Sequence, residues 1–183
     1  MRQAAAAVFA VVLALGACSS PAPVGGTLPG PVPTGVSFPD PPESAPEAPE
    51  FDLELLDGRV VDATEHWDDR PVVLVFFEPW CTLCREQQSG INELADEYRD
   101  IVLFLGIAGQ AEPDEIEDYV AETGITYPVG TDPDGTRWLK YAVAEPPLVA
   151  LISKDGRLLR GWPGGVAGDD LRGHIEELAV DSG

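Results

Sequence analysis

From Phe51 onward, apolar segments alternate with turn signals along this chain. The longest run, Pro71–Phe77, holds β-branched and aromatic residues without a polar break, as expected of a central strand that is covered on both faces. Ile101–Ala108 has the same character and predicts a second buried strand. Residues 51–183 are therefore predicted to form one globular domain, which is long enough to bury a proper core.

Two hairpins and several helices complete the predicted domain. Asp57-Gly58 and Lys154-Asp155-Gly156 each separate two short apolar segments, which predicts hairpin turns. The spacing of apolar residues predicts helices over 81–99, 113–122 and 169–179, with a short helix after the turn at 131–135. This order of elements predicts an α/β sandwich with a mixed sheet.

The segment before the domain has a different composition. Residues 19–50 hold ten of the 18 prolines and almost no apolar periodicity. Pro-rich chains are extended and semi-rigid, so residues 18–50 are predicted to form a disordered tether in front of the domain. An unimportant spacer would have the same composition.

The first 17 residues have the layout of a signal peptide, with Arg2 followed by an apolar stretch that is too short to span a bilayer. Leu15-Gly16-Ala17-Cys18 also looks like a bacterial lipobox, in which the cysteine becomes the lipid-bearing N-terminus. We therefore expect a lipoprotein signal peptide over 1–17, a lipid on Cys18, and an extracytoplasmic domain anchored to the bacterial cell membrane. An ordinary secreted protein cleaved nearby, or a free cysteine at position 18, is the alternative.

Two further cysteines, Cys81 and Cys84, are left to pair with each other. Cys81 falls at the predicted start of a helix, where unpaired N–H groups and the helix dipole favour a thiolate. Cys84 lies one turn further on the same side and is placed to resolve a mixed disulfide.

The formal net charge of −21 argues against nucleic acid or an anionic lipid surface as a partner.

The segment Val72–Cys84, VVLVFFEPWCTLC, resembles the active-site strand of the thioredoxin superfamily, in particular its TlpA/ResA/DsbE-like extracytoplasmic branch. Residues 125–160 follow the pattern of that branch, and Asp52–Trp67 is similar to its N-terminal hairpin. The resemblance implies a thioredoxin-like three-layer α/β/α sandwich with a mixed central sheet and an N-terminal β-hairpin. It also implies thiol–disulfide exchange with protein substrates, and no cofactor beyond the redox-active disulfide.

The resemblance leaves the direction of electron flow open. A lipid anchor, a tether and carboxylates near the dithiol favour a reductase of apocytochrome c or other oxidised thiols, fed by a membrane electron donor of the CcdA/DsbD type. The alternative is an oxidase of secreted protein thiols.

Three residues are expected to shape the substrate site. By position before the next strand, Pro147 corresponds to the cis-proline that faces the dithiol in this family. Pro146 occupies the place whose backbone pairs with a bound peptide in relatives, and it has no N–H to donate, so we expect weaker or shifted peptide binding. Alternatively, Pro146 only stiffens the turn. Trp80 is expected to present an apolar rim beside Cys81, with core packing as its alternative.

The acid–base groups of relatives are replaced here. Their carboxylate lies either under the dithiol, at the position of Val75, or three residues beyond the second cysteine, at Gln87, and both residues are neutral in this chain. Glu78 and Glu86 are the candidates to exchange a proton with Cys84, against the alternative of solvated surface charges. A carboxylate close to Cys81 would raise the pKa of its thiol. Strongly oxidising proteins of this kind stabilise the thiolate, so a role as a strong oxidant is then less favoured.

Rival functions fit the sequence less well. A structural zinc site needs four ligands, and the chain offers neither a second cysteine pair nor clustered histidines. A peroxiredoxin would resemble Pro-x-x-x-Thr-x-x-Cys, whereas residue 81, three before Cys84, is itself a cysteine. A copper-delivery module would show wider cysteine spacing and methionine-rich surfaces, and Met1 is the one methionine.

Overall fold

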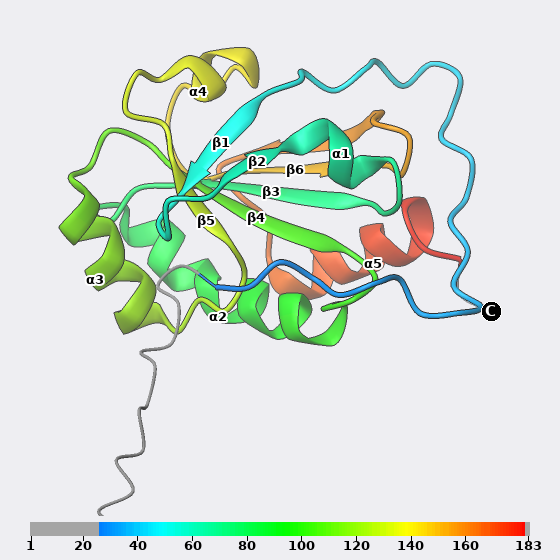
Figure 1. Cartoon of the computed structure of the whole chain (residues 1–183), viewed down its shortest axis with the longest axis horizontal. Coiled ribbons are helices and arrows are strands. Elements are labelled where there is room, and N and C mark those ends of the chain that lie inside the picture. Colours follow the sequence, from blue (N-terminus) through cyan, green and yellow to red (C-terminus); the bar gives the residue numbers. More distant parts are fainter. Residues whose placement is uncertain (1–25, 182–183) are drawn as a thin grey trace, which may run out of the picture.

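The computed structural model describes residues 26–181 and contains one mixed seven-stranded sheet with the strand order β2-β1-β5-β4-β3-β6-β7 (Figure 1). The strands are β1 (Asp52–Leu55), β2 (Val60–Asp62), β3 (Val72–Phe77), β4 (Leu103–Ala108), β5 (Val129–Thr131), β6 (Leu148–Ile152) and β7 (Leu158–Pro163). The helices are α1 (Ala63–Trp67), α2 (Thr82–Glu97), α3 (Pro113–Thr123), α4 (Thr136–Lys140) and α5 (Gly168–Leu178). No helix within the described residues has the length and apolar character needed to cross a membrane.

The central strands explain the unbroken apolar runs of the sequence. β3 pairs in parallel with β4 and antiparallel with β6, and every residue of β3 and β4 is buried. Side chains of a strand alternate between faces, so Val73, Val75 and Phe77 pack with α2, α3 and α5 in one core. The other face of β3 packs with β1, α1 and Tyr141 in a second core.

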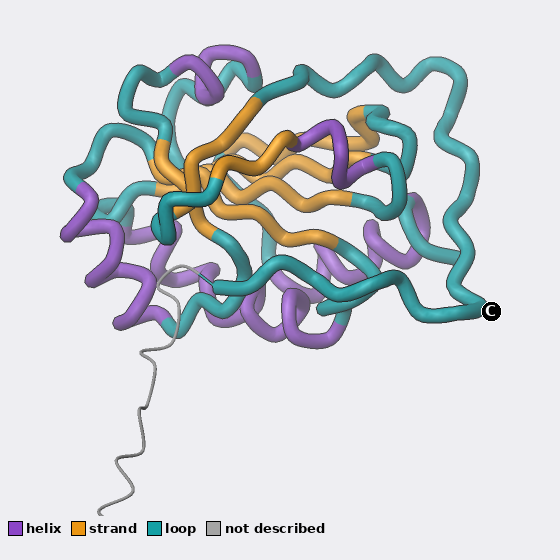
Figure 2. The backbone as a smooth tube through the Cα atoms, in the orientation of Figure 1, coloured by secondary structure: helices purple, strands orange, loops and turns teal. Residues whose placement is uncertain are grey.

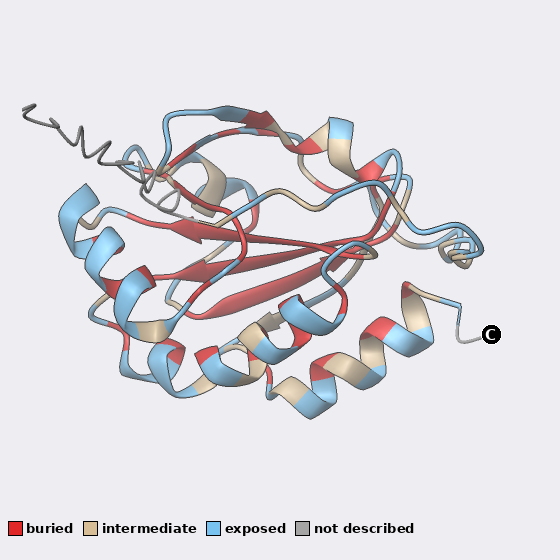
Figure 3. Ribbon diagram, turned by 60° about the horizontal axis from the view of Figure 1, so that its bottom comes forward, coloured by how far each residue is buried: buried red, intermediate tan, exposed pale blue. Residues whose placement is uncertain are grey.

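The longer helices α2, α3 and α5 lie together on one side of the sheet, with their exposed faces turned outward (Figure 3). The predicted thioredoxin-like α/β/α sandwich with a mixed central sheet and an N-terminal β-hairpin is therefore confirmed. The hairpin β1–β2 extends the sheet through antiparallel pairing of β1 with β5.

Two short elements were not predicted from the sequence. β5 has three residues and lies between β1 and β4, and α1 has five residues and follows β2 directly. The Asp62 carboxylate caps α1 by accepting from the Thr64 N–H at 2.8 Å. Elements this short contain too few residues to show a hydrophobic periodicity in the sequence. Strand pairing and helix capping in the folded chain determine their conformation.

The described part of the predicted tether lies on the domain, which corrects the expectation of a disordered segment from residue 18 to residue 50. Figure 2 shows residues 26–50 as a long loop that follows the outside of the domain before it reaches β1. Backbone hydrogen bonds join Thr27 N–H to Thr126 O at 3.2 Å and Ala48 N–H to Gly156 O at 2.8 Å. Proline-rich sequence excludes a regular helix or central strand here, but the extended chain still binds along a surface. Residues 1–25, with the predicted signal peptide and Cys18, lie outside the described residues.

Candidate active site

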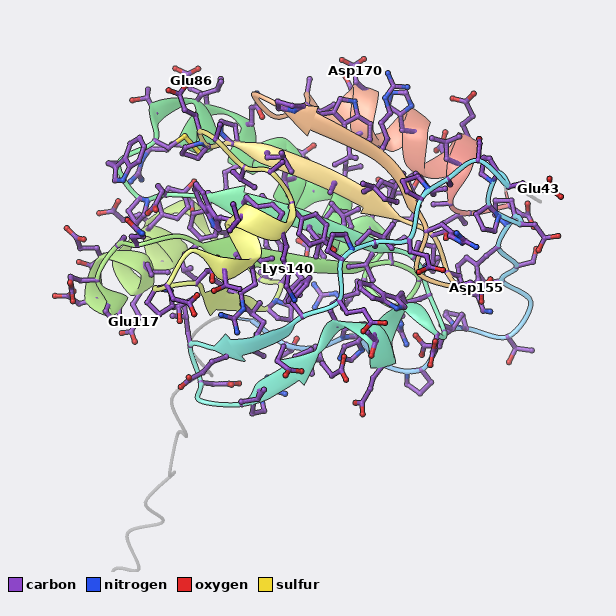
Figure 4. The ribbon with its side chains drawn as sticks, turned by 90° about the horizontal axis from the view of Figure 1, so that it is seen from above. Glu43, Glu86, Glu117, Lys140, Asp155 and Asp170 are labelled. Carbon is purple, nitrogen blue, oxygen red and sulfur yellow. A yellow bond between two sulfur atoms is a disulfide. The ribbon has the colours of Figure 1, made fainter. Side chains whose placement is uncertain are left out.

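Cys81 lies where β3 ends and α2 begins, and it is the N-cap residue of that helix. Its side chain forms a disulfide with Cys84, and its Sγ accepts a hydrogen bond from the Cys84 N–H at 3.0 Å. The free N–H groups of a helix N-terminus stabilise negative charge, so this position favours the thiolate of Cys81 once the disulfide is reduced. Figure 4 shows the sulfur atoms at this end of α2, near the labelled Glu86.

Two exposed apolar side chains neighbour the disulfide in the sequence. Cys81 and Cys84 are 5% and 3% exposed, whereas Trp80 is 71% and Leu83 42% exposed. Both large apolar side chains are therefore open to contact by another chain next to the cysteines. Trp80 is therefore exposed and not packed in the core, and its role as a rim for a partner chain stays a prediction.

The peptide bond between Pro146 and Pro147 is cis, as predicted. The next residue, Leu148, pairs with Phe76 of β3, so the two prolines reach the same edge of the sheet as the segment that carries Cys81. Pro147 O accepts from Gly164 N–H at 2.8 Å, and Gly164 O accepts from the Gln87 side chain of α2 at 3.2 Å. This chain of contacts couples the proline loop to the helix of the dithiol.

The region under the disulfide is apolar and neutral. Val75 is buried in the same core as both cysteines. Further along α2, the buried Gln88 donates to the Tyr127 hydroxyl at 2.8 Å, and burial raises the pKa of Tyr127. Burial also raises the pKa of Tyr119 to about 12, so this phenol stays protonated at neutral pH.

Glu78 is a buried carboxyl group beside the disulfide segment, with 4% of its surface exposed. Its Oε1 accepts from the Gln110 N–H at 2.8 Å, and its Oε2 has no hydrogen-bond partner among the described residues. Burial is the largest effect on the pKa of Glu78 and raises it, while the N–H groups of Gln110 and Ala111 act in the opposite direction. Within the described part of the chain, no hydrogen bond joins this carboxyl to either cysteine.

Glu86, the other acid–base candidate, is exposed on α2. Residues two positions apart in a helix point about 200° away from each other around its axis. Glu86 and Cys84 therefore face different sides of α2. Figure 4 shows Glu86 at the outer edge of the molecule.

Sequence reasoning did not place Trp138 at the site. It comes from α4, contacts Phe76 edge-on at 6.2 Å between ring centroids, and lines a cavity together with Glu78, Trp80 and Pro146. The sequence predicts only a short helix after the turn at 131–135, and only the fold brings α4 next to the β3–α2 junction. Among residues 26–181, no three His, Cys, Asp or Glu side chains gather in a way that could hold a metal ion.

Comparisons with known proteins agree with this geometry. Residues 45–160 match the model of the AhpC/TSA family. The thiol-disulfide oxidoreductase ResA of Geobacillus thermodenitrificans is 27% identical over 132 residues, which cover 72% of this chain and 75% of that protein.

Two solved structures are similar over most of their length. A secreted disulfide oxidoreductase of Mycobacterium tuberculosis, described as homologous to DsbE of E. coli, is 26% identical with a TM-score of 0.63 and covers 70% of this chain and 96% of that one. The exposed lipoprotein thioredoxin of Streptococcus pneumoniae is 27% identical with a TM-score of 0.61 and covers 71% of this chain and 100% of that one.

Proposed function

The chain belongs to the AhpC/TSA family and is a thiol–disulfide oxidoreductase of the TlpA/ResA/DsbE-like class, and on this premise we propose that it reduces disulfides of protein substrates outside the cytoplasm. The observation that carries the proposal is the position of Cys81, which is the N-cap of α2, is paired with Cys84 and directly follows the exposed Trp80.

The exchange begins with the reduced enzyme. The Cys81 thiolate attacks one sulfur of a client disulfide, a bond forms between Cys81 and the client, and the second client sulfur leaves as a thiolate. The Cys84 N–H, which contacts Cys81 Sγ at 3.0 Å, is placed to stabilise the attacking thiolate.

Cys84 then attacks Cys81 Sγ, the disulfide of the enzyme forms, and the client leaves with two thiols. The client disulfide thereby takes up two electrons from the enzyme and two protons from solvent and becomes two thiols. Renewed turnover needs two electrons from a donor, which we propose is a membrane protein of the CcdA/DsbD type.

We further propose that Cys18 carries a lipid that holds the domain at the outer face of the cell membrane. The pneumococcal relative is described as an exposed lipoprotein, which supports this location for the class. Replacement of Cys18 by Ser should move the protein from the membrane fraction to the medium, and an unchanged distribution would argue against the anchor.

Trapping of mixed disulfides tests the roles of the two cysteines. Cys84→Ala should accumulate client proteins joined to Cys81, because no thiol remains to release them. Cys81→Ala should trap none and should lose disulfide-reducing activity. Retained activity in Cys81→Ala would overturn the assignment.

The direction of electron flow is tested by the reduction potential. A reductase should have a potential below about −180 mV, the value typical of a disulfide isomerase. A potential well above that value, together with oxidation of reduced secreted proteins, would instead identify an oxidase. Reduction of peroxide with a thiol as electron donor would point to a peroxidase.

A further inference from the structure

A cavity of about 310 Å³ opens beside the disulfide segment. Its walls come from four separate parts of the chain, the β3–α2 junction, the β4–α3 loop, α4 and the loop before Pro147, and they consist of Glu78, Trp80, Gly109, Gln110, Gly135, Trp138, Ala144, Glu145 and Pro146. Its size is at the lower end of the range of about 300–1,000 Å³ that is typical of ligand pockets.

Two buried polar atoms belong to residues of this cavity and have no partner among the described residues, Glu78 Oε2 and Trp138 Nε1. A buried polar atom without a hydrogen bond costs about 1–3 kcal/mol, so such atoms are rare and call for an explanation. One is an acceptor and the other is a donor, which suits a ligand that brings both kinds of group.

The walls favour a positive charge. Glu78 and the exposed Glu145 both line the cavity, and none of its lining residues is basic. Glu115 of α3 adds a further negative charge that acts on Glu78. The exposed indole ring of Trp80 offers a flat surface on which a guanidinium group stacks.

We propose that this cavity binds an arginine side chain of the client polypeptide, close to the client cysteine that reacts with Cys81. Glu78 Oε2 and Trp138 Nε1 are both closed to solvent in this structure, so binding requires the side chains of the cavity wall to shift. The guanidinium group then stacks on Trp80 and donates to Glu78 Oε2, and a neighbouring carbonyl group of the client accepts from Trp138 Nε1. Trp80 immediately precedes Cys81, and Pro146 immediately precedes Pro147, so a chain that reaches the disulfide passes the mouth of the cavity.

The proposal deepens the proposed function and rests on it. The test uses three disulfide-linked peptides that carry arginine, norleucine or glutamate two positions before the reactive cysteine and are otherwise identical. A second set of three carries the same residues two positions after that cysteine. The reduced wild-type protein, Glu78→Gln and Glu117→Gln are compared by kcat/KM for reduction. Glu117 is the matched control because it is exposed on α3, does not line the cavity and loses the same charge (Figure 4).

We expect wild type to reduce the arginine peptide of one set about tenfold faster than the norleucine peptide, as one charge-assisted hydrogen bond allows. Glu78→Gln should remove most of this preference, and Glu117→Gln should keep it. An exposed charge reversal, Glu145→Lys, should lower the rate for arginine and raise it for glutamate without disturbing the core, which keeps the test valid if Glu78→Gln folds poorly.

Four results would overturn the proposal. The arginine preference could be absent in wild type or survive in Glu78→Gln, it could fall equally in Glu117→Gln, or Glu78→Gln could slow all peptides by the same factor with a shifted pH profile. The last result would identify Glu78 as a proton-transfer group for the cysteines. Failure of wild type to reduce any of the peptides would instead count against the proposed function itself.

Discussion

Gly109 provides the space that the Glu78 carboxyl group and the Trp138 ring occupy. A Cβ atom at position 109 would overlap Glu78 Oε1 and would lie 2.9 Å from the Trp138 ring. The absence of a side chain at this residue therefore allows the buried carboxyl to reach the Gln110 N–H. A small residue directly after β4 is thus a requirement of the site and not only of the turn.

Gly109→Ala should destabilise the fold by about 1–3 kcal/mol, the usual cost of excess atoms in a packed region. Urea unfolding measures the change, with Gly161→Ala as the control because a Cβ at position 161 meets nothing within 4 Å. Equal stability of the two variants would show that the Glu78 side chain moves aside freely.

Replacement of Glu78 by Gln should make stability less sensitive to pH. Burial raises the pKa of Glu78 in the folded state above its ordinary value of 4.5. At a pH between the ordinary and the raised pKa, the folded state holds a proton that the unfolded state has lost. The folded state then binds more protons, and wild-type stability falls as the pH rises through this window. Glutamine does not titrate, so the stability of Glu78→Gln relative to wild type should increase with pH and then level off.

Urea unfolding at several pH values between about 4 and 8, a range that begins below the ordinary pKa of the Glu78 carboxyl group, tests this. Asp62→Asn serves as the control, because hydrogen bonds from Thr64 lower the pKa of Asp62 and its contribution stays constant above the ordinary value of 3.8. A stability difference between Glu78→Gln and wild type that does not change with pH would contradict the burial of a titrating carboxyl.

The residues of the disulfide were predictable because their chemistry depends on local spacing. Cys81 and Cys84 are neighbours on one helix turn, so their signature lies within a few residues. Pro147 was predicted from the resemblance to the family, by its position before an apolar strand. The environment of Glu78 depends on Gln110 and Trp138, which are distant in sequence. No local pattern indicates that a carboxyl group after a strand is buried rather than solvated.

At the scale of elements, the helix that carries the disulfide is supported by a close crossing with α5. A Cβ at Gly90 of α2 would lie 3.2 Å from Gly168 Cα at the start of α5, so the two backbones meet at this point without side chains between them. Close backbone approach fixes the position of α2 against the rest of the domain. The geometry of the Cys81–Cys84 segment therefore depends in part on a glycine two turns further along.

Gly90→Val should force α2 and α5 apart and destabilise the domain by about 1–3 kcal/mol more than Gly173→Val does. Both substitutions place the same β-branched residue in a helix, so propensity is matched, and a Cβ at Gly173 meets nothing within 4 Å. Urea unfolding compares the two. Equal losses would mean that helix propensity, and not the crossing, accounts for the effect.

Long, strongly patterned elements were predicted correctly, and their limits agree with the structure within a few residues. The apolar runs of β3 and β4 and the periodic helices α2, α3 and α5 each contain enough residues to show their period. β5 was missed because Pro128 and Gly130 interrupt its apolar character, and its strand conformation follows from pairing with β1 and β4. Sheet order likewise depends on long-range pairing that no local segment encodes.

At the scale of the whole molecule, residues 26–50 bind the domain at points far apart in the sequence. Arg70, which is 4% exposed, donates to Gly30 O at 2.9 Å and to Asp100 O at 3.2 Å, and Gly30 N–H donates to the Asp100 carboxylate at 3.0 Å. The Ser37 hydroxyl donates to Asp181 at 2.8 Å near the other end of the described chain. A segment of composition typical of a linker thus completes the hydrogen bonding of a buried cation.

Removal of this segment should weaken the fold without changing the redox chemistry. A chain that begins at residue 45 loses the Gly30 carbonyl from the buried Arg70 and the apolar contact of Leu28 with the core, so we expect a stability loss of about 1–3 kcal/mol. The reduction potential of the Cys81–Cys84 pair should stay the same, because the removed residues bind near Arg70, Thr126 and Asp181 and not at the β3–α2 junction.

A chain that begins at residue 26 is the control for this comparison, since it keeps every described contact of the segment. Urea unfolding gives the stability, and equilibration with a glutathione buffer gives the potential. If the two chains unfold at the same urea concentration, the segment does not stabilise the domain and acts as a free tether after all. If the potential also shifts on removal, residues 26–44 influence the disulfide through the rest of the domain, because no hydrogen bond joins them to either cysteine among the described residues.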